Sequence, residues 1–200
     1  MEQKEIFFIL STARCRSSWF GNLFTYKDSF CYKEQSRYMS SLDEFGDLIN
    51  KRPEKYVGFC DPELLHFIET LYSLFPKAKY VLLERNRQAA ESSLLHNASY
   101  PEWMTPSIIK GKFDRWDKDI KKFKEIVKHY ECIHFNDMSI QSQIEKIWRY
   151  ILPNSTFDVD RWELLTSLRV SVTFGDVPYV INHDTCIAPY FNLKKLETVK

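Results

Sequence analysis

Arginine and hydroxyl side chains are concentrated in one short segment near the start of the chain, residues 11–19 (STARCRSSW). Arg14 and Arg16 can form charge-assisted hydrogen bonds with phosphate oxygens, and Ser17 and Ser18 supply two more donors. The segment lies between a strand-like apolar run and a helical pattern. The free N–H groups and the positive dipole end of that helix therefore add to the same site. This pattern predicts a phosphate-binding loop.

The loop is not a Walker A motif, because both glycines of the GxxxxGK pattern are missing and no lysine precedes the hydroxyl residue. An ordinary ATPase or kinase is therefore disfavoured. A second interpretation is purely structural: Ser17 and Ser18 cap the helix while the arginines are solvated.

A second polar cluster follows a later apolar run and contains Arg85, Arg87 and Ser93. Ser93 lies eight residues after Arg85, about two turns into the next helix, so the two side chains meet only if the intervening loop folds back. We expect the two clusters to hold different phosphates of one nucleotide.

Four short apolar runs are predicted to be buried strands that position these clusters: residues 6–10, 56–59, 80–83 and 132–135. Each run precedes a helical pattern, which indicates a parallel sheet covered on both faces. We therefore expect a three-layer α/β sandwich with a central parallel sheet of four to five strands, a P-loop-like nucleotide-binding fold. Ligands of such sheets bind at the carboxyl ends of the strands, where both clusters lie.

Apolar residues at helical spacing predict helices over residues 64–75, 89–96, 115–130 and 140–151. Asp61, followed by Pro62, fits a helix N-cap, and Asp137 or Ser139 is expected to cap the last of these helices. The length of 200 residues favours one domain over residues 1–200, with a core over 1–155. Residues 156–200 are expected to form an extension packed on it, with a turn at Gly175 and a strand on either side.

The composition excludes several classes of function. With 28 basic and 27 acidic residues the formal net charge is +1, so no global field indicates nucleic acid or an anionic membrane as a partner. No apolar run is long enough to span a membrane or form a signal-peptide core, so we expect a cytoplasmic protein. The five cysteines are widely spaced without a CxxC pair and are expected to be reduced thiols.

Two segments resemble the nucleotide-binding motifs of the sulfotransferase family, which uses 3'-phosphoadenosine 5'-phosphosulfate (PAPS). Residues 13–20 (ARCRSSWF) resemble its phosphosulfate motif, although Arg16 stands where the family has glycine. Residues 81–93 (VLLERNRQAAESS) resemble its 3'-phosphate motif, with Arg87 in place of proline. Two looser matches, residues 58–65 and 135–138, resemble two further segments of the family. The four segments occur along this chain in the same order as in the family. The glycine-rich motif near the C-terminus of cytosolic members is not found.

The resemblance implies a sulfotransferase that moves a sulfuryl group from PAPS to a hydroxyl or amine of a small-molecule or glycan acceptor, without a metal. It implies that the nucleotide is bound by Arg14, Cys15, Arg16, Ser17, Ser18, Trp19, Arg85 and Ser93. Arg14 would also stabilise the leaving phosphate. Such a transfer needs a base near the acceptor proton.

The identity of that base stays open. Cys60 stands at the place of the family histidine, and a thiol suits the role poorly. Glu34, which resembles a glutamate of some bacterial members, is the first candidate, although it also fits an ion pair with Lys33. Asp61 is the second, although it fits an N-cap better. His66, at the margin of an apolar helical stripe, fits a core or surface histidine better than a base. The alternatives for the whole chain are an inactive nucleotide-binding or interaction protein with this fold and a divergent nucleotide kinase.

Overall fold

The computed structural model describes residues 4–41, 44–96 and 104–167. The strands are β1 (Glu5–Ser11), β2 (Ser29–Lys33), β3 (Tyr56–Cys60), β4 (Lys79–Glu84) and β5 (Tyr130–His134). The α-helices are α1 (Ser17–Phe24), α2 (Glu44–Lys51), α3 (Ile68–Leu74), α4 (Arg87–Leu95), α5 (Pro106–Ile126), α6 (Gln141–Ile151) and α7 (Val159–Ser167). Three 3₁₀ helices complete the list: η1 (Gln35–Tyr38), η2 (Pro62–Phe67) and η3 (Phe135–Ser139).

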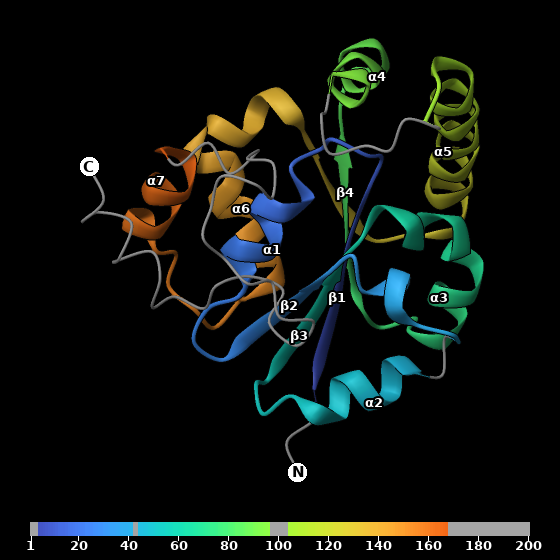
Figure 1. Cartoon of the computed structure of the whole chain (residues 1–200). Coiled ribbons are helices and arrows are strands. Elements are labelled where there is room, and N and C mark those ends of the chain that lie inside the picture. Colours follow the sequence, from blue (N-terminus) through green and yellow to red (C-terminus); the bar gives the residue numbers. More distant parts are fainter. Residues whose placement is uncertain (1–3, 42–43, 97–103, 168–200) are drawn as a thin grey trace.

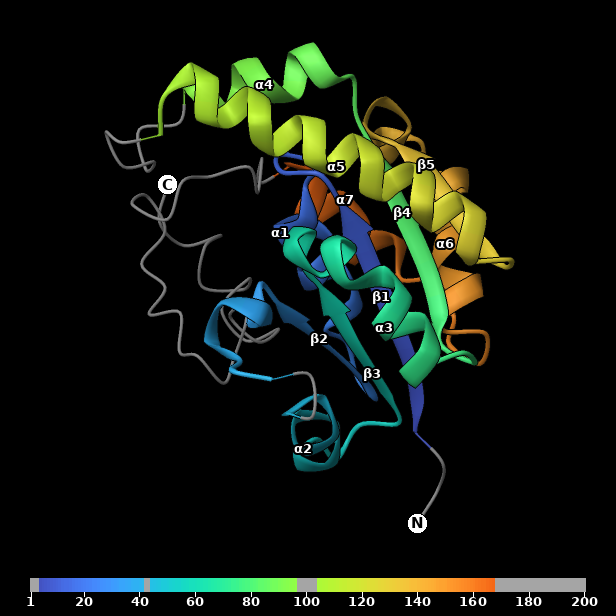
Figure 2. The same ribbon diagram turned by 90° about the vertical axis from the view of Figure 1, so that its right-hand side faces the viewer.

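The five strands form one sheet in the order β2-β3-β1-β4-β5, and every pairing between neighbours is parallel. Side chains alternate along β1, so Phe7 and Ile9 pack with α1 and α6, whereas Phe8 and Leu10 pack with α3 and α5. The helices consequently lie in two layers on opposite sides of the sheet (Figures 1 and 2). The three-layer α/β fold with a parallel sheet is confirmed.

A close contact between β1 and β3 explains the glycine in the middle of β3. Phe7 is paired with Gly58 in the register, and its ring covers the glycine. A Cβ atom at position 58 would lie 2.0 Å from the Cε2 atom of Phe7, so a side chain there requires the ring to move. The aromatic ring thus takes the space that a side chain would fill in the buried centre of the sheet.

Several predicted boundaries and caps were wrong. The helix expected over residues 115–130 is α5, Pro106–Ile126, which begins earlier behind Thr105 and ends before Tyr130 opens β5. The helix expected over 64–75 begins as the 3₁₀ helix η2. Neither Asp137 nor Ser139 caps α6, because these residues belong to η3 and Ile140 occupies the N-cap position without a side-chain bond. The pattern over 135–151 holds two short helices rather than one capped helix.

Elements that the sequence pattern did not predict are β2, α2 and α7. The α7 helix packs on α1, where the guanidinium group of Arg161 donates hydrogen bonds to the carbonyl oxygens of Asn22, Leu23 and Thr25. These carbonyls lie in the last turn of α1 and just after it, so Arg161 closes the C-terminal end of α1. The turn expected at Gly175 lies outside the described residues.

No helix in the described ranges combines the length and the apolar character that crossing a bilayer requires.

Candidate functional site

The loop between β1 and α1 turns through two left-handed residues. The backbone φ angles of Arg14 and Arg16 are 65° and 61°, a region in which residues other than glycine are uncommon. Arg16 occupies the N-cap position of α1, and no side chain caps this helix. The first N–H groups of α1 therefore have no capping side chain and are available to an anion.

The two predicted clusters meet at this loop. The Nε atom of Arg14 donates a hydrogen bond to the hydroxyl of Ser93 at 3.1 Å. The Nη1 atom of Arg85 donates to the carbonyl oxygen of Arg14 at 2.6 Å. The loop after β4 thus folds back, so that residues from the two sequence motifs lie together at the carboxyl end of β1 and β4.

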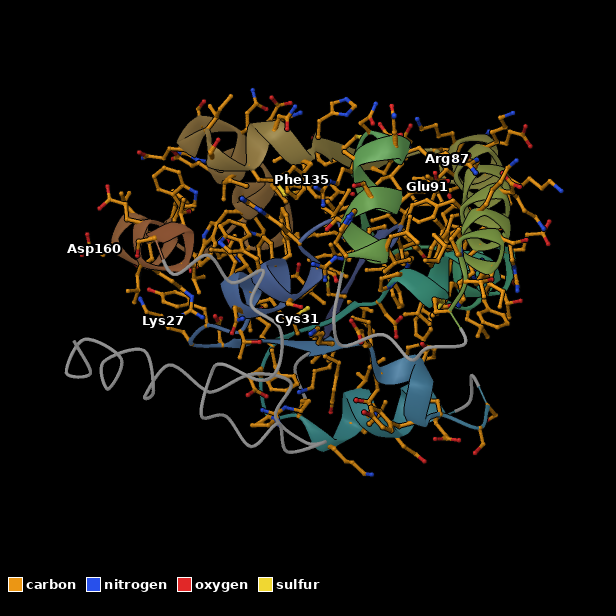
Figure 3. The ribbon with its side chains drawn as sticks, turned by 45° about the horizontal axis from the view of Figure 1, so that its top comes forward. Lys27, Cys31, Arg87, Glu91, Phe135 and Asp160 are labelled. Atoms are coloured by element: carbon orange, nitrogen blue, oxygen red, sulfur yellow. The ribbon has the colours of Figure 1, made fainter. Side chains whose placement is uncertain are left out.

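An aromatic ring that was not among the predicted site residues joins the two clusters. The guanidinium carbon of Arg85 lies 4.0 Å from the ring centroid of Phe135, and that of Arg16 lies 4.8 Å from the same centroid. Phe135, labelled in Figure 3, is the first residue after β5. Cation–π contacts with one ring hold both arginines at the loop. The feature of the sequence that could have identified Phe135 as a site residue is its position at the end of a strand of the same sheet.

No carboxylate of the described residues forms an ion pair with Arg14, Arg16 or Arg85. Burial, together with the positive charges of Arg14 and Arg16, lowers the pKa of Arg85. Three like charges in one place disfavour one another, and a bound anion would remove that cost. The arrangement therefore fits phosphate binding better than solvated arginines.

Arg87, two residues after Arg85, provides a contrast within the same segment. Its guanidinium group lies 2.6 Å from a carboxylate oxygen of Glu91, 2.7 Å from Asp114 and 2.6 Å from Asp117. Arg87 and Glu91 belong to α4, and their side chains lie between α4 and α5 (Figure 3). The charge of Arg87 is fully paired, and this residue fastens α4 to α5.

Two predicted nucleotide-binding side chains lie in the core. Cys15 is fully buried, with its Sγ atom 3.2 Å from the Thr12 hydroxyl, and burial raises the pKa of its thiol. Trp19 is 2% exposed and packs edge-on against Phe20. Neither side chain faces the loop's surface, which leaves only their backbone N–H groups for a ligand. Ser17 is buried at 8% exposure and Ser18 is half-buried.

The candidate bases lie at the carboxyl ends of β2 and β3. Both carboxylate oxygens of Asp61 accept backbone hydrogen bonds, Oδ1 from Glu63 at 3.0 Å and Oδ2 from Ser36 at 2.8 Å. Asp61 is completely buried, and burial raises the pKa of its carboxyl group. The predicted N-cap is confirmed, and Asp61 offers no free oxygen to an acceptor.

Glu34 follows β2 directly and has a left-handed backbone with φ 48°. Its N–H donates to the carbonyl oxygen of Cys60, and its carboxylate lies 3.9 Å from the ammonium group of Lys33. The thiol of Cys60 is fully buried and donates to the carbonyl oxygen of Ser17 at 3.1 Å. Glu34 is therefore two strands from the phosphate loop, at the same edge of the sheet.

His66 has a structural environment. Its Nδ1 atom is hydrogen-bonded to the carboxylate of Asp119, its Nε2 atom lies 3.2 Å from Glu63, and its ring stacks on Trp116. These contacts join η2 to α5, and they account for both ring nitrogens without a catalytic role.

A hollow of about 580 Å³ opens beside Arg85, on the side of α5. A volume of this size is typical of small-molecule sites. The hollow is lined by Thr12, Glu84, Arg85, Asn86, Arg87, Phe113, Asp117, Ile120, Lys121, Lys124 and His134.

Two solved structures with a similar arrangement of elements are sulfotransferases. The crystal structure of a sulfotransferase from Alicyclobacillus acidocaldarius matches with a TM-score of 0.57 and 15% sequence identity, covering 84% of this chain and 92% of that one. The chain has the sulfotransferase fold. Mouse sulfotransferase SULT7A1, crystallised in complex with PAP, matches with a TM-score of 0.57 and 14% identity, covering 84% of this chain and 65% of the mouse chain.

No protein-family model and no curated protein sequence matches the chain. The similarity to the sulfotransferase fold therefore lies in the three-dimensional structure.

Proposed function

We propose that the chain transfers a sulfuryl group from PAPS to a hydroxyl or amine of a small-molecule or glycan acceptor and releases adenosine 3',5'-bisphosphate (PAP). The observation that carries this proposal is the convergence of Arg14, Arg16 and Arg85 without a carboxylate partner in the described part of the chain. The reaction would take place in the cytoplasm, in keeping with five widely spaced cysteines and no CxxC pair in the sequence.

The cationic loop would bind the phosphates of the nucleotide. Arg14 and the N–H groups at the start of α1 would hold the 5'-phosphosulfate, and Arg85 with Ser93 would hold the 3'-phosphate. A hydrogen bond that involves a charged group is worth roughly 1.5–3 kcal/mol, so each arginine should contribute measurably to nucleotide affinity. The residues that surround the phosphates supply fixed positive charge, and no step of the proposed transfer uses a metal.

The transfer itself is an in-line displacement at sulfur. The acceptor oxygen or nitrogen forms a bond with sulfur while the bond between sulfur and the bridging phosphate oxygen breaks, and PAP leaves with the electron pair. Arg14 and the loop N–H groups stabilise the charge that develops on the leaving phosphate. The acceptor proton goes to a base, and we assign this role to the Glu34 carboxylate, because the oxygens of Asp61 are occupied and the thiol of Cys60 is buried.

An inactive nucleotide-binding protein is the second candidate. One observation favours it: Cys60, at the position of the family histidine, is fully buried and donates to a carbonyl oxygen within the fold. Loss of that histidine removes one base, whereas the cationic loop would still bind the nucleotide.

The experiment that separates the two candidates measures PAP formation from PAPS in the presence of hydroxyl and amine acceptors, alongside calorimetric titration with PAP. We expect both turnover and binding. Glu34→Gln should retain PAP binding and lower turnover by about 100-fold or more, the usual scale for a general base. Glu125→Gln, an exposed carboxylate on α5, is the matched control. Binding without turnover on any acceptor would support the inactive protein, and a lack of both would refute the proposal.

A further inference from the structure

Three side chains that can coordinate a metal lie together on β4 and β5, next to the arginine cluster. They are Glu84, Cys132 and His134, and one potential ligand atom from each lies within 4.8 Å of those of the other two. Cys132 and His134 are two residues apart on β5 and therefore face the same side of the sheet. Glu84 is paired with His134 in the strand register. Two adjacent strands thus fix the backbone positions of all three residues.

The distances within this cluster suit a tetrahedral ion. The Oε2 atom of Glu84 lies 3.3 Å from the Sγ atom of Cys132 and 3.8 Å from the Nδ1 atom of His134. Zinc bonds of about 2.0–2.3 Å with tetrahedral angles place neighbouring ligand atoms about 3.3–3.7 Å apart. Small side-chain rotations would therefore bring the three atoms onto one ion.

A lysine fixes the orientation of the carboxylate. Lys124 of α5 donates to the Oε1 atom of Glu84 at 2.6 Å, so the Oε2 atom is the one that faces Cys132 and His134. Hydrogen bonds of this kind orient ligating carboxylates in metal sites. The Glu84 side chain is 19% exposed, whereas that of His134 is 67% exposed, so an ion can approach from solvent.

We propose that Glu84, Cys132 and His134 bind a zinc ion. A thiolate, an imidazole and a carboxylate form a donor set that zinc prefers, and three protein ligands leave the fourth tetrahedral position open. Glu84 and His134 also line the hollow beside Arg85, so a small molecule in the hollow can reach that position. The ion has no part in the sulfuryl transfer, and the proposal stands independently of it.

Two costs oppose binding. Lys124 carries a positive charge next to the carboxylate, and burial, with the nearby Glu84, raises the pKa of the Cys132 thiol to about 12. Zinc must therefore displace the thiol proton, as it does at other cysteine ligands.

The test titrates zinc into the full-length protein in competition with a chromophoric chelator, and repeats the titration with cobalt to detect thiolate-to-metal charge-transfer absorption. We expect one ion per chain and a thiolate band. Cys132→Ser and His134→Ala should each weaken zinc binding by about tenfold or more, and Cys132→Ser should abolish the band. His129→Ala, an exposed histidine outside the cluster, should bind as the wild type does.

Cys132 and His134 lie on β5, the edge strand of the sheet, and circular dichroism of each variant tests whether the fold is retained. Absence of zinc binding in the wild type would overturn the proposal. Equal binding by Cys132→Ser, His134→Ala and the wild type would also overturn it, because the ion would then lie elsewhere. PAP titration of the same variants reports separately on the nucleotide site.

Discussion

The Arg85 guanidinium group donates a 2.6 Å hydrogen bond to the carbonyl oxygen of Arg14, 71 residues earlier in the chain. The same group lies over the ring of Phe135. Arg85 therefore has two tasks: it fixes the backbone of the phosphate loop and it places a positive charge beside that loop. Both tasks depend on a planar group that can donate in one direction and stack in another.

Arg85→Lys tests this double role. Lysine keeps the charge, but its ammonium group cannot stack on Phe135 while donating in a fixed geometry, so PAP affinity should fall by about tenfold. Isothermal titration calorimetry measures the change. Arg149→Lys on α6, where the arginine pairs only with Glu145 among described residues, is the matched control and should leave affinity unchanged. Equal affinities for Arg85→Lys and the wild type would show that the charge alone matters.

Arg16→Gly tests the departure from the family glycine. The side chain of Arg16 lies over Phe135, and we infer that it adds a third cation to the site. PAP affinity should therefore fall by about tenfold. Removal of the left-handed strain and loss of the cation–π contact offset each other, so the free energy of unfolding should change by less than about 1 kcal/mol.

Arg16→Asn provides the comparison for that variant, because asparagine tolerates a left-handed backbone without supplying a charge. Both variants should lose affinity. Tighter PAP binding by Arg16→Gly would mean that the arginine obstructs the loop.

The sequence alone predicted the layers of the fold and the main cations of the candidate site. Strands that are apolar throughout, such as 80–83, and helices with an apolar stripe indicate a parallel sheet with two covered faces, and such a sheet places Arg14 and Arg85 at one edge. Their contact depends on the path of the loop after β4, which local spacing does not determine. The strand β2 was missed because its five residues, SFCYK, include a polar residue at each end.

The roles of individual side chains were harder to predict than their positions. Trp19 matches the family pattern and Cys15 lies within the same segment, yet both side chains pack inward, because the sequence pattern does not distinguish a backbone contribution from a side-chain one. Phe135 joins Arg16 to Arg85 only in the folded chain, since these three residues follow three different strands, β5, β1 and β4 respectively.

Asp61→Asn tests the buried N-cap. Asparagine can accept only one of the two backbone hydrogen bonds, so the variant should be about 1–2 kcal/mol less stable in urea denaturation. Burial raises the pKa of Asp61 above its ordinary value of 3.8 in the folded state. As pH rises from 3.8 to the folded pKa, the folded chain retains a proton that the unfolded chain has lost.

The free energy of unfolding of the wild type should therefore fall through that range relative to the variant, which lacks the titrating group. Urea denaturation of both proteins across acidic pH measures the difference. If the stability of the wild type relative to Asp61→Asn instead grows as pH rises, the folded-state pKa of Asp61 is lowered rather than raised.

Gly58→Ala tests the contact in the centre of the sheet. The new Cβ atom would overlap the Phe7 ring, so the variant should be about 1–3 kcal/mol less stable in thermal or urea denaturation. Gly58→Ala combined with Phe7→Leu should lose less stability than the two single variants added together, because each change relieves the other. Gly111→Ala on α5, where an added Cβ atom would meet no atom within 4 Å outside its chain neighbours and the backbone of its own helix, should instead be slightly stabilising. Additive losses in the double variant would exclude the contact as the cause.

The most direct measurement of the central claim is calorimetric titration of the wild type and Arg14→Ala with PAP in the absence of metal, repeated with ATP and Mg²⁺. We predict that the wild type binds PAP without metal, that ATP and Mg²⁺ bind more weakly, and that Arg14→Ala lowers PAP affinity by at least about 1.5 kcal/mol, or roughly tenfold. Unchanged PAP affinity in a folded Arg14→Ala variant, or a preference for ATP with Mg²⁺, would contradict the account.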